Sequence, residues 1–288
     1  TGSLSALGDS ASEFEQMMAE LLEKRQEVSA EEFLKITEQR MTAFLEKYHD
    51  SPEAVEIHLN LGQLFSQSGS PDMAISHLEI YVDRSEGRKP AEIAVAKFFL
   101  AQAHITRDEF DEAERYLADV QAAGDMAPAQ LKQMTDITLK RIPILKNLRI
   151  GNPALPIDAV TTAGDEISLE SYRGKVLLVD FWASWCKPCR QEMPTVKSVY
   201  KEFHGKGFEI LGISMDQSEA SFKSYIEEQG ITWPQVFDGQ GWKSAVGQQY
   251  GINSIPATFL LDRNGTIRYR DLRGEKLRDA VRELIGSG

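Results

Sequence analysis

The 288-residue sequence is poor in cysteine, lacks any long apolar run and carries no excess of basic residues. Its only two cysteines are Cys186 and Cys189, whereas a disulfide-stabilised scaffold distributes more cysteines along the chain. Without a run of about 18 apolar residues, no segment is expected to span a membrane. The net charge of -12 argues against nucleic acid as a partner, because neither half of the chain offers a basic face.

Length and charge divide the chain into two parts. A chain of 288 residues favours two domains of ordinary size. Residues 1–150 carry a net charge of -10 and residues 151–288 one of -2, so the acidic part is interpreted as a solvated helical surface. Residues 1–12 are small and polar, without the basic and apolar regions of a secretory signal, so we expect that such a signal was never present or was removed.

The first part has the apolar spacing of helices. Residues 9–48 predict two helices, and Ser29 followed by Glu32 forms a capping box at the start of the second. Ser51 and Pro52 supply a cap and a first-turn proline for the next helix. A break over residues 124–128 precedes a last helix that we expect to be kinked or ended near Pro143.

An internal repeat follows within this helical part. The spacing that joins Gly62 to Ala74 and Leu78 recurs 39 residues later at Ala101, Ala113 and Leu117. Small residues at these places let two helices approach closely, and the pattern resembles tetratricopeptide proteins. Such an array forms a partner-binding groove, or else it serves as a helical cap or dimerisation element. We place a tetratricopeptide-like domain at 1–148 and the second domain at 149–288.

The second part alternates strands with helices. Apolar runs predict buried strands at 176–179 and 208–214, and residues 160–169 and 257–270 predict hairpins. Helical spacing covers 190–203, 218–229, 243–250 and 275–285. The expected fold is an α/β mixed sheet with helices on both faces.

The two cysteines stand where the strand from Val176 gives way to a helix. At such a junction, orphan backbone N–H groups and the helix dipole favour an anion, and a thiolate is that anion. Zinc needs two further ligands, which no second C-x-x-C or paired-histidine motif supplies. A Cu(I) dithiolate remains an alternative, because soft thiolates suit Cu(I).

Residues 152–286 resemble the thioredoxin superfamily and, within it, the TlpA/ResA-like thiol-disulfide oxidoreductases. The resemblance rests on Val179–Cys189 (VDFWASWCKPC), on Ser254–Thr258 (SIPAT) and on the insertion at 216–250. It implies a thioredoxin-like fold in which the Pro256 loop lies opposite the cysteines. Peroxiredoxins, on the same fold, need a Pro-x-x-x-Thr/Ser-x-x-Cys pattern that residues 179–186 do not provide.

The resemblance assigns roles to both cysteines. Cys186, at the start of the helix, is expected to be the more exposed thiol and the nucleophile, with a lowered pKa that Lys187 lowers further. Cys189 is the resolving thiol, which attacks the mixed disulfide and releases the substrate. Pro188 fixes the start of the helix. Trp185, Lys187 and Pro188 are expected to contact the substrate.

Two acids and a proline complete the predicted site. Burial would raise the pKa of Asp180 and make it a proton carrier for Cys189. Glu192 lies three residues beyond Cys189 and returns to nearly the same helix face. Pro256 is expected to follow a cis peptide bond, and Ile255 to offer backbone groups to an extended substrate strand.

These features predict thiol-disulfide exchange with protein substrates through Cys186 and Cys189. The resemblance favours a periplasmic or otherwise extracytoplasmic bacterial reductant, for instance in cytochrome c maturation or copper-site assembly, with a cytoplasmic location as the alternative. We expect an upstream thiol electron donor, no metal, and no cofactor beyond the redox-active disulfide. The alternatives are a partner-binding adaptor that uses the helical repeats and a Cu(I) chaperone that uses the two cysteines.

Overall fold

The computed structural model describes residues 2–286, and the side chains of all of these except residues 2–8, 30 and 31. The chain divides into two compact units, one ending at Ile142 and the other beginning at Pro143. Among the described helices, none combines the length and the apolar character needed to cross a bilayer.

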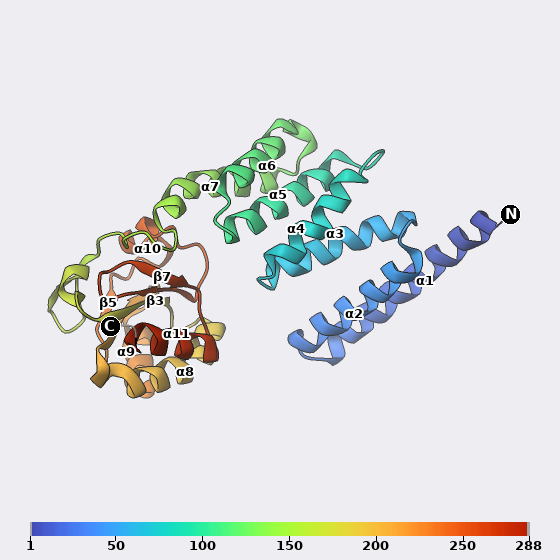
Figure 1. Cartoon of the computed structure of the whole chain (residues 1–288). Coiled ribbons are helices and arrows are strands. Elements are labelled where there is room, and N and C mark those ends of the chain that lie inside the picture. The colour runs from blue at the N-terminus through green and yellow to red at the C-terminus, as the bar shows by residue number, and fades with distance from the viewer. Residues whose placement is uncertain (1, 287–288) are drawn as a thin grey trace. The chain divides into compact units, whose positions relative to one another are not determined.

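The first unit is built of helices alone (Figure 1). The last helix runs through Pro143, so this proline does not end it, and continues to Asn147 in the second unit. A 3₁₀ turn at Gly124–Met126 occupies the predicted break. The helices are α1 (Gly2–Glu27), α2 (Ala30–Tyr48), α3 (Pro52–Gln67), α4 (Pro71–Asp83), α5 (Pro90–Thr106), α6 (Phe110–Ala122) and α7 (Ala129–Asn147).

The predicted helix starts are confirmed by their caps. The Ser29 hydroxyl accepts a hydrogen bond from the backbone N–H of Glu32 at 3.2 Å, and Ser51 does the same for Ala54 at 3.2 Å. These bonds satisfy donors that the helix itself leaves unpaired. Pro52 is the first residue of α3, where its missing N–H removes no helical hydrogen bond.

Close packing between α3 and α4 depends on Gly62. A Cβ atom at this position would lie 2.4 Å from Cγ of the buried Leu78. The corresponding small residues Ala74, Ala101 and Ala113 are also fully buried. Small residues therefore allow close helix packing here, as the repeat predicts. That the unit is a tetratricopeptide domain stays a prediction.

The second unit holds a five-stranded mixed sheet and a separate two-stranded hairpin. The sheet order is β5-β4-β3-β6-β7, in which β3 pairs parallel with β4 and antiparallel with β6. Hairpin β1–β2 lies where the sequence predicts it. The strands are β1 (Asp158–Val160), β2 (Glu166–Ser168), β3 (Val176–Trp182), β4 (Phe208–Ser214), β5 (Gln235–Phe237), β6 (Ala257–Leu261) and β7 (Ile267–Arg270).

Helices cover both faces of the sheet, which confirms the predicted fold class. Helices α8, α9 and α11 lie on one face, and α10 lies on the other (Figure 1). Trp182 contacts Tyr225 of α9 on the first face, and the preceding Phe181 contacts Tyr250 after α10 on the second. The helices are α8 (Lys187–Phe203), α9 (Glu219–Gln229), α10 (Ala245–Gln249) and α11 (Gly274–Gly286).

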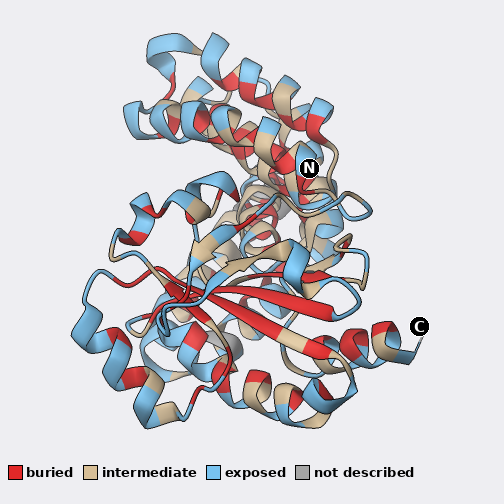
Figure 2. Ribbon diagram, turned by 90° about the vertical axis from the view of Figure 1, so that its left-hand side faces the viewer, coloured by how far each residue is buried: buried red, intermediate tan, exposed pale blue. Residues whose placement is uncertain are grey.

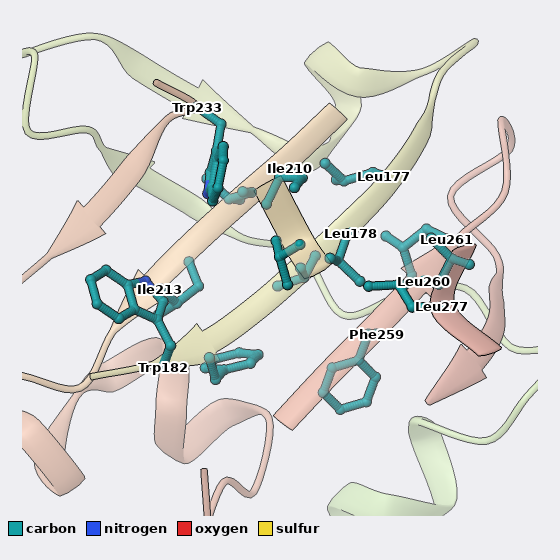
Figure 3. Packing of buried hydrophobic residues seen from close by; sticks show 14 of the residues in the cluster. Leu177, Leu178, Trp182, Ile210, Ile213, Trp233, Phe259, Leu260, Leu261 and Leu277 are labelled. Atoms are coloured by element: carbon teal, nitrogen blue, oxygen red, sulfur yellow. The ribbon is translucent and has the colours of Figure 1, made fainter. Parts of the chain in front are cut away.

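The core of this unit surrounds β3, every residue of which is buried (Figure 2). Leu178 of β3, Leu260 of β6 and Leu277 of α11 lie close together on one side of the sheet (Figure 3). A strand buried on both faces reads as a continuous apolar run, which is why Val176 to Val179 predicts it. Asp180 is the one charged residue in the strand.

The end of α7 belongs to the core of the second unit. Leu148 is fully buried there, and Ile144 packs against the same cluster. The carbonyl of Leu148 accepts a hydrogen bond from Arg270 of β7 at 3.3 Å. The division of the structure therefore falls before Pro143, whereas the sequence places the boundary after residue 148; which residues fold as independent domains stays a prediction.

We predict that Gly62→Ala destabilises the first unit by about 1–3 kcal/mol, because the new methyl group overpacks against Leu78. Urea denaturation followed by far-ultraviolet circular dichroism measures this loss. In a Leu78→Ala background, which provides the missing space, Gly62→Ala should cost less. Equal costs in the two backgrounds would contradict the proposed overpacking.

Candidate active site

The two cysteines lie at the junction between β3 and α8 and are joined by a disulfide. Cys186 is the N-cap of α8, and Cys189 lies in the first turn of the helix. The backbone N–H of Cys189 points at Cys186 Sγ at 3.2 Å. The positive end of the helix dipole is thus directed at this sulfur. Pro188 lies in the first helical turn, as expected.

The Ile255–Pro256 loop faces the disulfide, and its peptide bond is cis, as expected from the sequence. The Ile255 carbonyl oxygen lies 3.6 Å from Cys186 Sγ. Arg273 Nη2 donates a hydrogen bond to the Pro256 carbonyl at 2.8 Å, which fixes the far side of the loop. The predicted neighbourhood of Cys186, Ile255 and Pro256 therefore exists in the fold.

The expectation that Cys186 is the more exposed cysteine holds only by a small margin in this oxidised state, in which both cysteines are buried. Cys186 is 4% exposed and Cys189 is 3% exposed. The bond to Cys189 occupies one side of the Cys186 sulfur, and the Ile255 carbonyl lies close on another. Disulfide formation thus covers the sulfur that the helix start alone would leave open.

Asp180 lies within β3, beside Gly212 of β4 and Thr258 of β6, and is buried. Burial, with a smaller contribution from nearby Glu192, raises the pKa of its carboxyl group to about 7, and Arg273 opposes the shift. In the described part of the chain, no protein donor hydrogen-bonds this carboxyl group. The loss of hydration of the charged form is therefore uncompensated.

Glu192 reaches the same region from α8. Its Oε1 accepts a hydrogen bond from the backbone N–H of Gly274, at the start of α11, at 2.7 Å. Asp180, Cys189, Glu192 and Arg273 all line one small cavity of about 10 Å³. This is close to the smallest space that holds a water molecule. The structure thus places the two predicted acids next to the second cysteine.

The side chains predicted to contact a substrate are accessible. Trp185 is 54% exposed, and Lys187 and Pro188 are exposed beside it. Trp182, three residues earlier, is 1% exposed and donates its indole N–H to Gln235 at 3.0 Å. The two tryptophans of one short motif therefore differ: Trp182 belongs to the core and Trp185 to the surface.

The structure adds Asp216 to the site, which the sequence analysis did not single out. Its buried carboxylate accepts hydrogen bonds from the Ser184 N–H at 3.0 Å, the Ser184 hydroxyl at 2.6 Å and the Ser214 hydroxyl at 2.9 Å. This network fixes the loop between Trp182 and Cys186. The sequence feature that could have identified Asp216 is its position just after the parallel strand β4, because functional residues gather at the carboxyl ends of such strands.

Among the residues whose side chains the structure describes, no group of three or more histidine, cysteine or acidic side chains lies close enough together to hold a metal ion. The expectation that the disulfide is the sole redox group stays a prediction.

Comparison with known proteins places this site in a family. Residues 150–270 match the AhpC/TSA family. Thiol-disulfide oxidoreductase ResA of Geobacillus thermodenitrificans is 33% identical over 124 residues, which cover 43% of this chain and 69% of that protein. The chain belongs to the ResA-like thiol-disulfide oxidoreductases. ResA of Bacillus thuringiensis is 27% identical over 140 residues, covering 49% of this chain and 79% of that protein.

A solved structure is similar in sequence to the same half of the chain. The thioredoxin domain of a thiol-disulfide oxidoreductase from Bacteroides vulgatus is 35% identical, and the match covers 48% of this chain and 98% of that one, with a TM-score of 0.45. The family match at residues 150–270 lies in the second unit, and the first unit is all helical. The enzyme class is that of a thiol-disulfide oxidoreductase with a Cys186–Cys189 pair.

We predict that Asp180→Asn removes a pH dependence of stability from this ResA-like domain. The folded-state pKa of about 7 lies above the ordinary 3.8, so the folded protein retains a proton that the unfolded chain releases. Stability should therefore fall as the pH rises from about 4 to about 7 and level off above that. Asparagine cannot ionise, so the stability of the variant should not change with pH in this way.

At pH 7 the variant should be the more stable form by up to about 4 kcal/mol, at about 1.4 kcal/mol for each pKa unit, and the difference should vanish near pH 4. Urea denaturation of both oxidised proteins across this pH range measures it. A stability difference that is independent of pH would show that Asp180 does not titrate as described.

Proposed function

We propose that this oxidoreductase reduces disulfides in particular protein substrates. The observation that carries the proposal is the Cys186–Cys189 disulfide at the N-terminus of α8, facing the cis Ile255–Pro256 loop. In this arrangement one sulfur can react with an incoming substrate, and a second sulfur lies beside it. The structure represents the enzyme after it has given up two electrons.

The first step is the attack of the reduced Cys186 thiolate on a sulfur of the substrate disulfide. The helix N-terminus and the Cys189 N–H stabilise the thiolate before it attacks. A bond forms between Cys186 and the substrate, and the other substrate sulfur leaves as a thiolate that takes a proton from water. The enzyme and substrate are then joined by a mixed disulfide.

The second step is the attack of Cys189 on Cys186 Sγ. Cys189 must lose its proton first, and we assign the acceptor role to Asp180, whose pKa of about 7 suits a base that works near neutrality. The shared cavity has room for a bridging water. Glu192 raises the pKa of Asp180 and so keeps it basic. The Cys186–Cys189 disulfide forms, and the second substrate sulfur leaves as a thiolate that takes a proton from water, so that the product is a dithiol.

The substrate segment is held across the cis-proline loop. The backbone at Ile255 lies beside Cys186 and suits an extended chain, which pairs through main-chain hydrogen bonds. We assign contacts on the other side to Trp185, Lys187 and Pro188, all exposed next to the disulfide. The disulfide is then the only cofactor this reaction requires.

The proposed setting is extracytoplasmic and bacterial, with an upstream thiol that returns electrons to the disulfide. The support is the family resemblance and the presence of only two cysteines, both within the redox pair. Cytochrome c maturation and copper-site assembly are settings that need such a reductant. We propose that the helical unit binds a protein partner, a role that its helix packing permits.

The experiment that tests the reaction uses the variants Cys189→Ser and Cys186→Ser with a synthetic peptide that carries one internal disulfide. Cys189→Ser should accumulate a mixed disulfide with the peptide, because the resolving thiol is missing. Mass spectrometry of the intact protein should show the added mass of one peptide. The matched variant Cys186→Ser should show none; equal trapping by both would refute the assigned order of attack.

We predict a reduction potential near the thioredoxin value of about -270 mV for the Cys186–Cys189 pair. It is measured in defined thiol–disulfide buffers by tryptophan fluorescence, since Trp185 adjoins the pair. A potential in that range means that an upstream donor can drive reduction of substrates. A potential near that of DsbA, about -120 mV, would mean an oxidant and would overturn the proposed direction.

A further inference from the structure

Two exposed tryptophans contact each other, and one of them is the residue directly before Cys186. Trp185 is 54% exposed and Trp242 is 47% exposed, and their ring centroids lie 6.1 Å apart with an interplanar angle of 59°. Trp185 directly precedes Cys186, whereas Trp242 comes from the short 3₁₀ turn Gly241–Lys243 between β5 and α10. Large half-exposed aromatic side chains in contact with each other form an apolar surface that water solvates poorly.

The backbone that precedes each tryptophan is held in place by contacts with another part of the domain. Ser184, before Trp185, is tied to Asp216 by two hydrogen bonds. Gly241, before Trp242, is buried against Gln217: a Cβ atom there would lie 2.8 Å from Gln217 Cγ, and its φ of +55° also favours glycine. A surface that is already held in place loses little conformational entropy when a partner binds.

We propose that Trp185 and Trp242 form a docking surface for a large apolar side chain next to the reactive cysteine of a protein substrate. This proposal rests on the proposed function, because it names the kind of substrate segment that the same site prefers. The surface includes the residue directly before Cys186, whose sulfur is joined to the substrate in the mixed disulfide. Its occupant is therefore the chain that carries the attacked sulfur.

The preferred segment follows from the chemistry of the surface. Indole rings offer broad apolar faces, which aromatic and large aliphatic side chains cover best. The Ile255 carbonyl lies against Cys186 Sγ and suits an extended backbone. We therefore expect a phenylalanine, tyrosine, leucine or similar side chain within one or two residues of the substrate cysteine.

The test uses the Cys189→Ser variant, joined through Cys186 to glutathione and then equilibrated with a peptide thiol. The peptide sulfur forms the new bond to Cys186, and glutathione leaves as a thiol, so the equilibrium constant reports the stability of the mixed disulfide. Two peptides are compared that differ only in having Phe or Gly next to the cysteine. Mass spectrometry of the intact protein gives both constants.

We expect the Phe peptide to be preferred by about tenfold, in line with what one well-placed aromatic contact contributes. Adding Trp242→Ala should reduce this preference to near one, and Trp242→Phe should retain part of it. Val160→Ala, which shortens an equally exposed apolar side chain on β1, should leave the preference at its full value. Near-ultraviolet circular dichroism of the buried Trp182 and Trp233 checks that each variant is folded.

The possible outcomes distinguish failure of the docking surface from failure of the exchange reaction. A preference that survives Trp242→Ala, or no preference in the parent variant, would overturn the docking surface while leaving the exchange reaction intact. A preference that falls equally in Val160→Ala would overturn it as well. If neither peptide displaces glutathione from Cys186, then the proposed function itself fails.

Discussion

The active site depends on the burial of β3 on both faces. This strand passes through the middle of the sheet, and its apolar residues hold it rigidly between α8, α9 and α11 on one side and α10 on the other. Where the strand ends, the chain turns directly into α8 and delivers Cys186 to the helix N-terminus. The reactive sulfur is thus placed by the core of the domain rather than by a mobile loop.

The polar groups near this junction are stabilised in different ways. Asp216 is buried as an acceptor of three hydrogen bonds, which replace the water that its carboxyl oxygens lose. Asp180 is equally buried but lacks such donors, so its charged form is disfavoured and its pKa rises. The two aspartates therefore differ in chemistry: Asp216 positions the loop before Cys186, and Asp180 is suited to accept and release a proton.

Much of this arrangement follows from local sequence. The continuous apolar run marks β3, the serine caps mark α2 and α3, and the spacing from Cys186 to Cys189 marks the redox pair. These features depend on residues close together in the chain, so periodicity and capping chemistry are enough to predict them. The confirmed fold class follows from their order along the chain.

What the sequence left out depends on contacts between distant segments. The carbonyl oxygen of Ile255 lies 3.6 Å from Cys186 Sγ, and this contact from a distant segment helps to bury that cysteine. The meeting of Trp185 with Trp242 needs the turn at Gly241 to be held against Gln217, which no local pattern encodes. The partners of Asp216 likewise become clear only once β3 and β4 lie side by side.

The disulfide bond itself limits how the oxidised enzyme can be reached. Both cysteines are almost fully buried, and the Ile255 carbonyl oxygen lies 3.6 Å from Cys186 Sγ, so little open surface is left from which an incoming thiol can approach this sulfur. In the proposed reaction, Cys186 is both the sulfur that attacks the substrate disulfide and the sulfur that an incoming thiol attacks in the oxidised enzyme. Under that proposal, a single surface beside Cys186 is met by the substrate and by the thiol that reduces the enzyme, so selectivity at that surface acts on both.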